Sequence, residues 1–163
     1  AGMGAEGVCY GQRDVALADG WERMADGLRT VMQGVGCRIL FSSPARRCQM
    51  VAERVARFMN LELKVDSRLR EISFGEWEGR PWTHISRAAL DAWAADVSGF
   101  TPPGGENGSD LRARVRHFWT EMQQRGQSCA VLTHGGPLRS CTGWSMACPA
   151  ACWPRRRPWG RCG

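Results

Sequence analysis

Three short segments rich in apolar residues limit the folds that this chain can adopt. They occupy residues 38–41 (RILF), 61–65 (LELKV) and 129–133 (CAVLT), and we predict a strand at each, buried at the first and the third. Segments with apolar residues at helical spacing separate the three. Short apolar strands that alternate with amphipathic helices are typical of a mostly parallel sheet with helices on both faces. The pattern therefore predicts an α/β fold.

The expected helices have recognisable ends. Ser43, followed by proline, predicts the start of one helix, because serine caps helices and proline suits the first helical position. That helix should stop near Asn60. A second helical region is expected from Pro81, and Ser109 is expected to cap the helix that precedes the third strand.

The net charge of +6 comes mainly from the end of the chain. Residues 141–163 contain Arg155, Arg156, Arg157 and Arg161 but no Asp, Glu or Lys, so residues 1–140 carry only +2 (6 minus 4). A nucleic-acid-binding surface normally spreads its basic residues along a face or groove. We therefore expect no nucleic-acid partner.

Residues 141–163 also differ from the rest in composition, and we divide the chain there into a domain (1–140) and an atypical tail. Three prolines and three tryptophans leave the tail without a helix or strand period. The chain has a single lysine, Lys64, among 22 basic residues, which indicates GC-rich coding DNA. Two interpretations stay open: a frameshifted end, rich in Arg, Pro, Cys and Trp, or an ordinary disordered tail.

The sequence contains neither a run of eighteen apolar residues nor an N-terminal secretory signal, so we expect a cytoplasmic protein with no membrane partner. Its eight cysteines are scattered and lack the tight pairs of a metal site. We interpret them as reduced thiols and expect neither a metal nor another cofactor.

Polar clusters follow two of the predicted strands directly. Residues 42–44 (SSP), with Arg47 just beyond, follow the first strand, and residues 133–136 (THGG) follow the third. The carboxyl ends of parallel strands are where such sheets bind ligands. An arginine in the first turn of a helix can bind an anion, a histidine beside glycines can approach it, and Glu71 could supply a proton. Together these features predict a phosphate site.

Five motifs in this order extend the pattern, and their order resembles that of the histidine phosphatase superfamily, with its phosphoglycerate-mutase-like fold. The resemblance covers roughly residues 7–140. The opening CYGQ (residues 9–12) looks like the α-ribazole phosphatase branch, which acts in cobalamin assembly. The motifs are SSPARR (42–47), LRE (69–71), FGEWEG (74–79), PGGE (103–106) and THGG (133–136).

The resemblance implies a role for each matching residue and a small phosphorylated substrate. Arg47 would clamp the phosphoryl group, Glu71 would be the general acid, and His134 would bind the phosphoryl group and stabilise its charge. The remaining matches would line the mouth of the substrate site; they are Tyr10, Gln12 and Glu106.

One family motif is missing from this sequence. Family members begin with a strand that ends in Arg-His-Gly, whose histidine becomes phosphorylated. None of His84, His117 and His134 lies between an arginine and a glycine. We therefore expect a sheet without that first strand, a fold incomplete at both ends, and an inactive chain as written. Three functions stay open: an α-ribazole 5′-phosphate phosphatase, a broad-specificity phosphatase or phosphoglycerate-mutase-like enzyme, and a non-catalytic phosphate-binding remnant.

Overall fold

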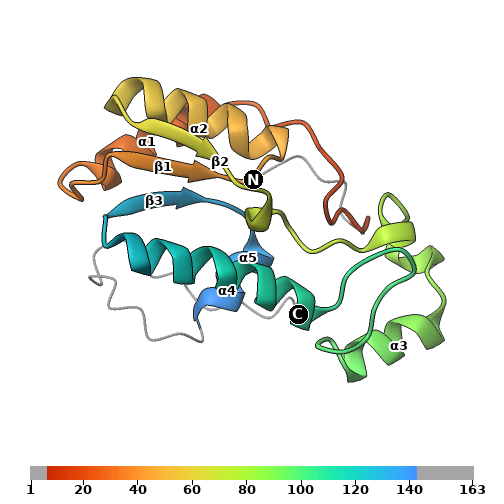
Figure 1. Ribbon diagram of the computed structural model, residues 1–163. Helices are drawn as coiled ribbons and strands as arrows, with labels where there is room; N and C mark the ends of the chain where they lie inside the picture. Colours follow the sequence, from red (N-terminus) through yellow and green to blue (C-terminus); the bar gives the residue numbers. More distant parts are fainter. Residues whose placement is uncertain (1–6, 143–163) are drawn as a thin grey trace, which may run out of the picture.

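The three predicted strands form one parallel sheet. The computed structural model describes residues 7–142, and the sheet has the order β2-β1-β3. Its strands are β1 (Ile39–Ser42), β2 (Glu62–Val65) and β3 (Cys129–Leu132), each within one residue of the predicted bounds. Every residue of β1 has a partner in both neighbours. All three strands therefore end at the same edge (Figure 1).

Helices cover both faces of this sheet, as predicted. α1 (Trp21–Met32) and α2 (Arg46–Met59) lie on one face, and α4 (Gly108–Arg125) lies on the other (Figure 1). Successive residues of a strand point to opposite faces. Leu40 therefore packs into the core beneath α1 and α2, while Phe41 packs into a second core beneath α4.

A third hydrophobic cluster lies beside the sheet and contains α3 (Arg87–Ala95). The ring of Phe74 lies edge-on to that of Trp93, with centroids 5.7 Å apart. Gly75 has a φ of 54°, and a Cβ there would overlap the main chain of residues 103–105, so the two loops can approach only because this residue is glycine. Short 3₁₀ turns at Ser67–Leu69, Gly75–Trp77 and Trp82–His84 complete this region.

Two predicted helix starts are wrong by one or more residues. α2 begins at Arg46 with Ala45 as its N-cap residue and no side-chain cap, while the Ser43 hydroxyl contacts Nε2 of His134 and accepts from the N–H of Ala45 just before the helix. α4 begins at Gly108, one residue before the expected Ser109 cap, and Asn107 caps it. The predicted stop of α2 is confirmed: its C-cap is Asn60, in the left-handed conformation.

α5 (Gly135–Thr142) has no counterpart among the predicted helices. Two glycines and a proline at its start hide the helical signal, although proline is tolerated in a first helical turn. α5 extends past the predicted domain boundary at residue 140. Residues 143–163 lie outside the described part of the chain, so the interpretations of the tail stay predictions. Among the described helices, none is long and apolar enough to cross a membrane.

The cap of α4 provides the first test. The Asn107 side chain accepts hydrogen bonds from the main-chain N–H groups of Ser109 and Asp110, each at 2.9 Å. We expect Asn107→Ala to lower the free energy of unfolding by about 1 kcal/mol, since two N–H groups lose their partner. Ser109→Ala should change it by less than about 0.5 kcal/mol. Urea unfolding measures both, and an equal loss in the two variants would contradict this capping assignment.

Candidate phosphate-binding site

Arg47, Glu71 and His134 meet at the carboxyl edge of the sheet. Each follows a different strand: Arg47 lies in the first turn of α2 after β1, Glu71 in the segment after β2, and His134 directly after β3. All three line one cavity of about 370 Å³. The Nη2 atom of Arg47 lies 3.2 Å from Nδ1 of His134. The structure thus brings together the three residues expected at the phosphoryl group.

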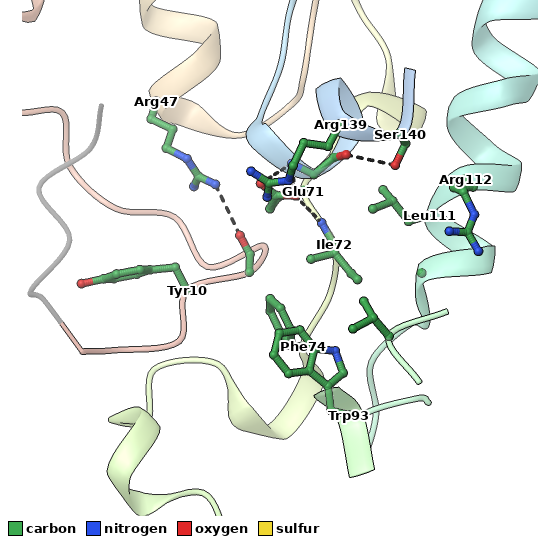
Figure 2. A pocket seen from close by; sticks show the side chains of 14 residues that line it. Tyr10, Arg47, Glu71, Ile72, Phe74, Trp93, Leu111, Arg112, Arg139 and Ser140 are labelled. Atoms are coloured by element: carbon green, nitrogen blue, oxygen red, sulfur yellow. Dashed lines mark hydrogen bonds between the residues drawn. The ribbon is translucent and has the colours of Figure 1, made fainter. Parts of the chain in front are cut away.

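A loop near the N-terminus holds the Arg47 guanidinium in place. Its Nη1 donates to the carbonyl of Arg13 at 2.9 Å, and its Nη2 donates to the carbonyl of Gly11 at 3.4 Å. The carboxylate of Asp14 lies 3.6 Å from Nη1. Figure 2 shows the guanidinium pointing from α2 toward this loop. The arginine is therefore oriented before any ligand arrives, which lowers the entropy lost on binding.

His134 is buried and electrically neutral at neutral pH. A guanidinium can only donate, so Nδ1 of His134 must accept from Arg47, and the ring proton lies on Nε2. Nε2 donates to the hydroxyl of Ser43 at 2.8 Å. Burial, followed by the positive charges of Arg47 and Arg114, lowers the pKa of His134 to about 4. These contacts therefore stabilise the neutral form of the ring.

The Glu71 carboxylate is held at the start of α5. It accepts from the main-chain N–H of Gly136 at 3.1 and 3.2 Å, and from that of Ile72 at 2.9 Å (Figure 2). The partial positive charge at a helix N-terminus favours a carboxylate there. A Cβ at position 136 would overlap the carboxylate, so this close approach requires glycine.

Arg114 of α4 supports the segment that carries Glu71, and the sequence analysis did not single it out. Its guanidinium donates to three main-chain carbonyls: those of Arg68 at 2.7 Å, Arg70 at 2.8 Å and Glu71 at 3.0 Å. It also forms a two-pronged ion pair with Glu106. In the sequence, the only feature of Arg114 is its spacing of three positions from the apolar Leu111 on the same helix. This spacing does not indicate which residues the guanidinium contacts.

Of the three residues expected at the substrate mouth, only Tyr10 lines the larger pocket, which measures about 730 Å³. The side chain of Gln12 donates to the carbonyl of Glu71 at 3.0 Å. Glu106 is bound by Arg114 and accepts from the N–H of Ser73 at 3.0 Å. Both side chains therefore contact the segment around Glu71, and a contact of either with substrate stays a prediction.

Cys48, one of the eight cysteines that the sequence analysis interprets as reduced thiols, also contacts the site. Its Sγ lies 3.6 Å from Nε2 of His134. Burial raises the pKa of this thiol to about 11, so it remains protonated at neutral pH. Within residues 7–142, no three His, Cys, Asp or Glu side chains gather as a metal site would require.

The chain is similar in sequence to a known family of phosphatases. A family model for the histidine phosphatase superfamily (branch 1) matches residues 3–162. The chain is 27% identical to glucosyl-3-phosphoglycerate phosphatase of Mycobacterium tuberculosis, over 88% of this chain and 70% of that protein. It is 30% identical to the fructose-2,6-bisphosphatase TIGAR of Bos taurus, over 92% of this chain and 54% of that protein. The chain spans about half the length of some curated relatives that it matches.

Solved structures share the fold. The native structure of a mycobacterial glucosyl-3-phosphoglycerate phosphatase matches with a TM-score of 0.74 and 25% identity, over 84% of this chain and 70% of that chain. The α-ribazole phosphatase of Shigella flexneri matches with a TM-score of 0.71 and 24% identity, over 82% and 68% of the two chains. The second likeness extends to the fold alone.

The lowered pKa of His134 predicts a pH dependence of stability. The ordinary histidine pKa is 6.5, and that of folded His134 is about 4. Between these values the unfolded chain binds a proton that the folded chain does not, so stability falls as the pH falls from about 6.5 to about 4. We expect a loss of up to about 3 kcal/mol across this window.

Urea unfolding at several pH values measures this loss. His134→Gln keeps a polar side chain but cannot titrate, so its stability should vary much less across the window. His117→Gln, on the exposed side of α4, should keep the full dependence. An unchanged slope in His134→Gln would assign the effect to another group.

The Arg114 contacts predict a second stability effect. Arg114→Lys keeps the charge but cannot reach three carbonyls and Glu106 together, and we expect it to cost about 2 kcal/mol of unfolding free energy. Arg116→Lys, on the same helix and exposed, is the matched control and should cost less than about 0.5 kcal/mol. A double-mutant cycle with Glu106→Gln should give a coupling above about 1 kcal/mol. Strict additivity in that cycle would contradict the pairing.

Proposed function

Because the chain belongs to the histidine phosphatase superfamily (branch 1), we propose that it binds the phosphoryl group of small phosphomonoesters and serves their hydrolysis. The observation that carries the proposal is the meeting of Arg47, Glu71 and His134 in one cavity at the carboxyl edge of the sheet. A forked cation, a neutral ring N–H and a carboxyl group are the three functions that a phosphoryl site needs besides a nucleophile.

Each residue has a distinct part in this proposal. Arg47 offers charge-assisted hydrogen bonds to the phosphoryl oxygens. His134 lies within reach of Arg47 and, being neutral, can exchange the Ser43 hydroxyl for a phosphoryl oxygen as acceptor of its Nε2 proton. Glu71 lines the cavity at the start of α5, and after its carboxyl group takes up a proton it would give that proton to the leaving oxygen.

The nucleophile of the family mechanism is a histidine that becomes phosphorylated. Among residues 7–142, the histidines other than His134 are exposed and line neither cavity. These are His84 and His117. The described residues therefore supply the clamp and the acid of the reaction, and the expectation that the chain as written does not turn over remains part of the proposal.

The choice of substrate is a separate question. The relatives' names describe phosphatases of two different compounds, glucosyl-3-phosphoglycerate and fructose 2,6-bisphosphate, so family membership alone does not select one. The α-ribazole 5′-phosphate hypothesis rests on the CYGQ stretch, whose Tyr10 lines the larger pocket. The rings of Phe74 and Trp93 on the same pocket could also face a nucleoside-like base.

Binding of orthovanadate, a phosphate mimic, tests the phosphoryl site. We expect the 163-residue chain to bind it measurably in isothermal titration calorimetry, and Arg47→Ala to weaken binding about 10-fold or more, since a charge-assisted fork is lost. Arg46→Ala is the matched control: this neighbour is exposed, and within residues 7–142 the contact recorded for it is that of its main-chain N–H with Asp14. Equal loss in the two variants would remove Arg47 from the site.

The same preparation should release essentially no phosphate from para-nitrophenyl phosphate. Removal of a covalent nucleophile from a comparable site typically lowers turnover by about 10⁵–10⁶-fold. Robust turnover that survives in His84→Ala and His117→Ala would show that a residue other than these histidines attacks phosphorus. Absence of both binding and turnover would overturn the phosphate-site assignment itself.

A further inference from the structure

The hydroxyl of Ser43 lies inside the site and contacts the ring of His134. Ser43 is fully buried, and its Oγ lies 2.8 Å from Nε2 of His134, so Oγ accepts the ring proton. The main-chain N–H of Ser43 donates to the carbonyl of Leu132 at 3.0 Å, which continues the pairing of β1 with β3 beyond the last strand residues. The main chain therefore holds position 43 beside His134 independently of the side chain there.

The polar groups of the site hydrogen-bond to one another. Among residues 7–142, no buried side-chain nitrogen or oxygen lacks a hydrogen-bond partner. Arg47 donates to Nδ1 of His134 at 3.2 Å, and Ser43 accepts from Nε2. A phosphoryl oxygen that accepts the Nε2 proton must therefore displace Ser43. The new hydrogen bond replaces one that the protein already makes.

Ser43 can release the ring proton without being left unsatisfied. Its Oγ also accepts from the main-chain N–H of Ala45 at 3.3 Å, and a side-chain hydrogen bond links Ser43 with the thiol of Cys48. The ring N–H of His134 is in the opposite position. A buried N–H that loses its acceptor costs free energy, so this group needs either Ser43 or a ligand oxygen at all times.

We propose that Ser43 is a positioning residue that holds the place of a phosphoryl oxygen: its hydroxyl keeps the Nε2–H of His134 hydrogen-bonded until the phosphoryl group becomes the acceptor. This inference rests on the proposed function and names the contact that phosphate binding must break. A hydrogen bond that is present before binding and lost on binding lowers affinity. Ser43 therefore stabilises the fold and at the same time weakens the binding of phosphate.

Ser43→Ala tests this role, because it removes the acceptor. Before binding, the buried Nε2–H of the variant has no hydroxyl to donate to, whereas in the complex it has the phosphoryl oxygen. We expect the 163-residue variant to bind orthovanadate about 3- to 10-fold more tightly than the parent in isothermal titration calorimetry, the effect of one hydrogen bond. Urea unfolding should show a lower stability. Loss of a merely structural contact would not raise affinity while lowering stability.

Two further variants serve as controls. Ser42→Ala removes the hydroxyl of the neighbouring residue, which is equally buried but donates to the carbonyl of Ser43 at 3.0 Å. Its affinity for orthovanadate should equal that of the parent. Ser43→Cys fills the space of the hydroxyl with a weak acceptor and should tighten binding as Ser43→Ala does. It also tests the role if Ser43→Ala does not fold.

Each remaining outcome contradicts a stated part of the argument. Equal or weaker binding of orthovanadate by both Ser43 variants would overturn this inference and leave the phosphoryl site standing. Tighter binding in Ser43→Ala alone would assign the effect to the space left by the hydroxyl, and an equal gain in Ser42→Ala would assign it to a loosened strand end. Either result would also overturn the role of Ser43. Failure of the parent to bind orthovanadate would overturn both proposals.

Discussion

The guanidinium of Arg114 connects the segments on which the site depends. It donates to three carbonyls in the segment after β2, those of Arg68, Arg70 and Glu71, and it pairs with Glu106 from the loop before α4. Because main-chain carbonyls inside a protein must be hydrogen-bonded, an irregular segment needs such a partner to hold one conformation. Arg114 thereby fixes the position from which Glu71 reaches the start of α5.

The second constraint is the neutral state of His134. The ring lies between a cation and a hydroxyl, and a positive charge on it would lie 3.2 Å from the Arg47 guanidinium in a buried position. The neutral ring avoids this repulsion and leaves Arg47 as the cation beside it in the cavity that we propose binds the phosphoryl group.

Local sequence patterns predicted the elements closely but not all of their ends. The three segments rich in apolar residues became the three strands, since short runs of this kind between amphipathic helices favour strands of a covered sheet. Helix starts were predicted less closely, because Ser43 and Ser109 suit a cap position by residue type but the structure uses neither as the cap. Ser43 contacts His134 ahead of α2, and Asn107 caps α4 in place of Ser109. α5 was missed because glycine at positions 135 and 136 lowers helix propensity.

The sequence by itself determined the parallel α/β architecture and the gathering of Arg47, Glu71 and His134. Each of these residues follows a strand, and the carboxyl ends of parallel strands lie at one edge of the sheet whatever the connections between the strands. Only the tertiary structure decided which polar residues line the pockets. The side chains of Gln12 and Glu106 accept or donate hydrogen bonds in the segment after β2, whereas Arg112 lines the larger pocket. Those orientations depend on contacts between residues distant in the sequence, such as Arg114 with the segment after β2, and no local pattern encodes them.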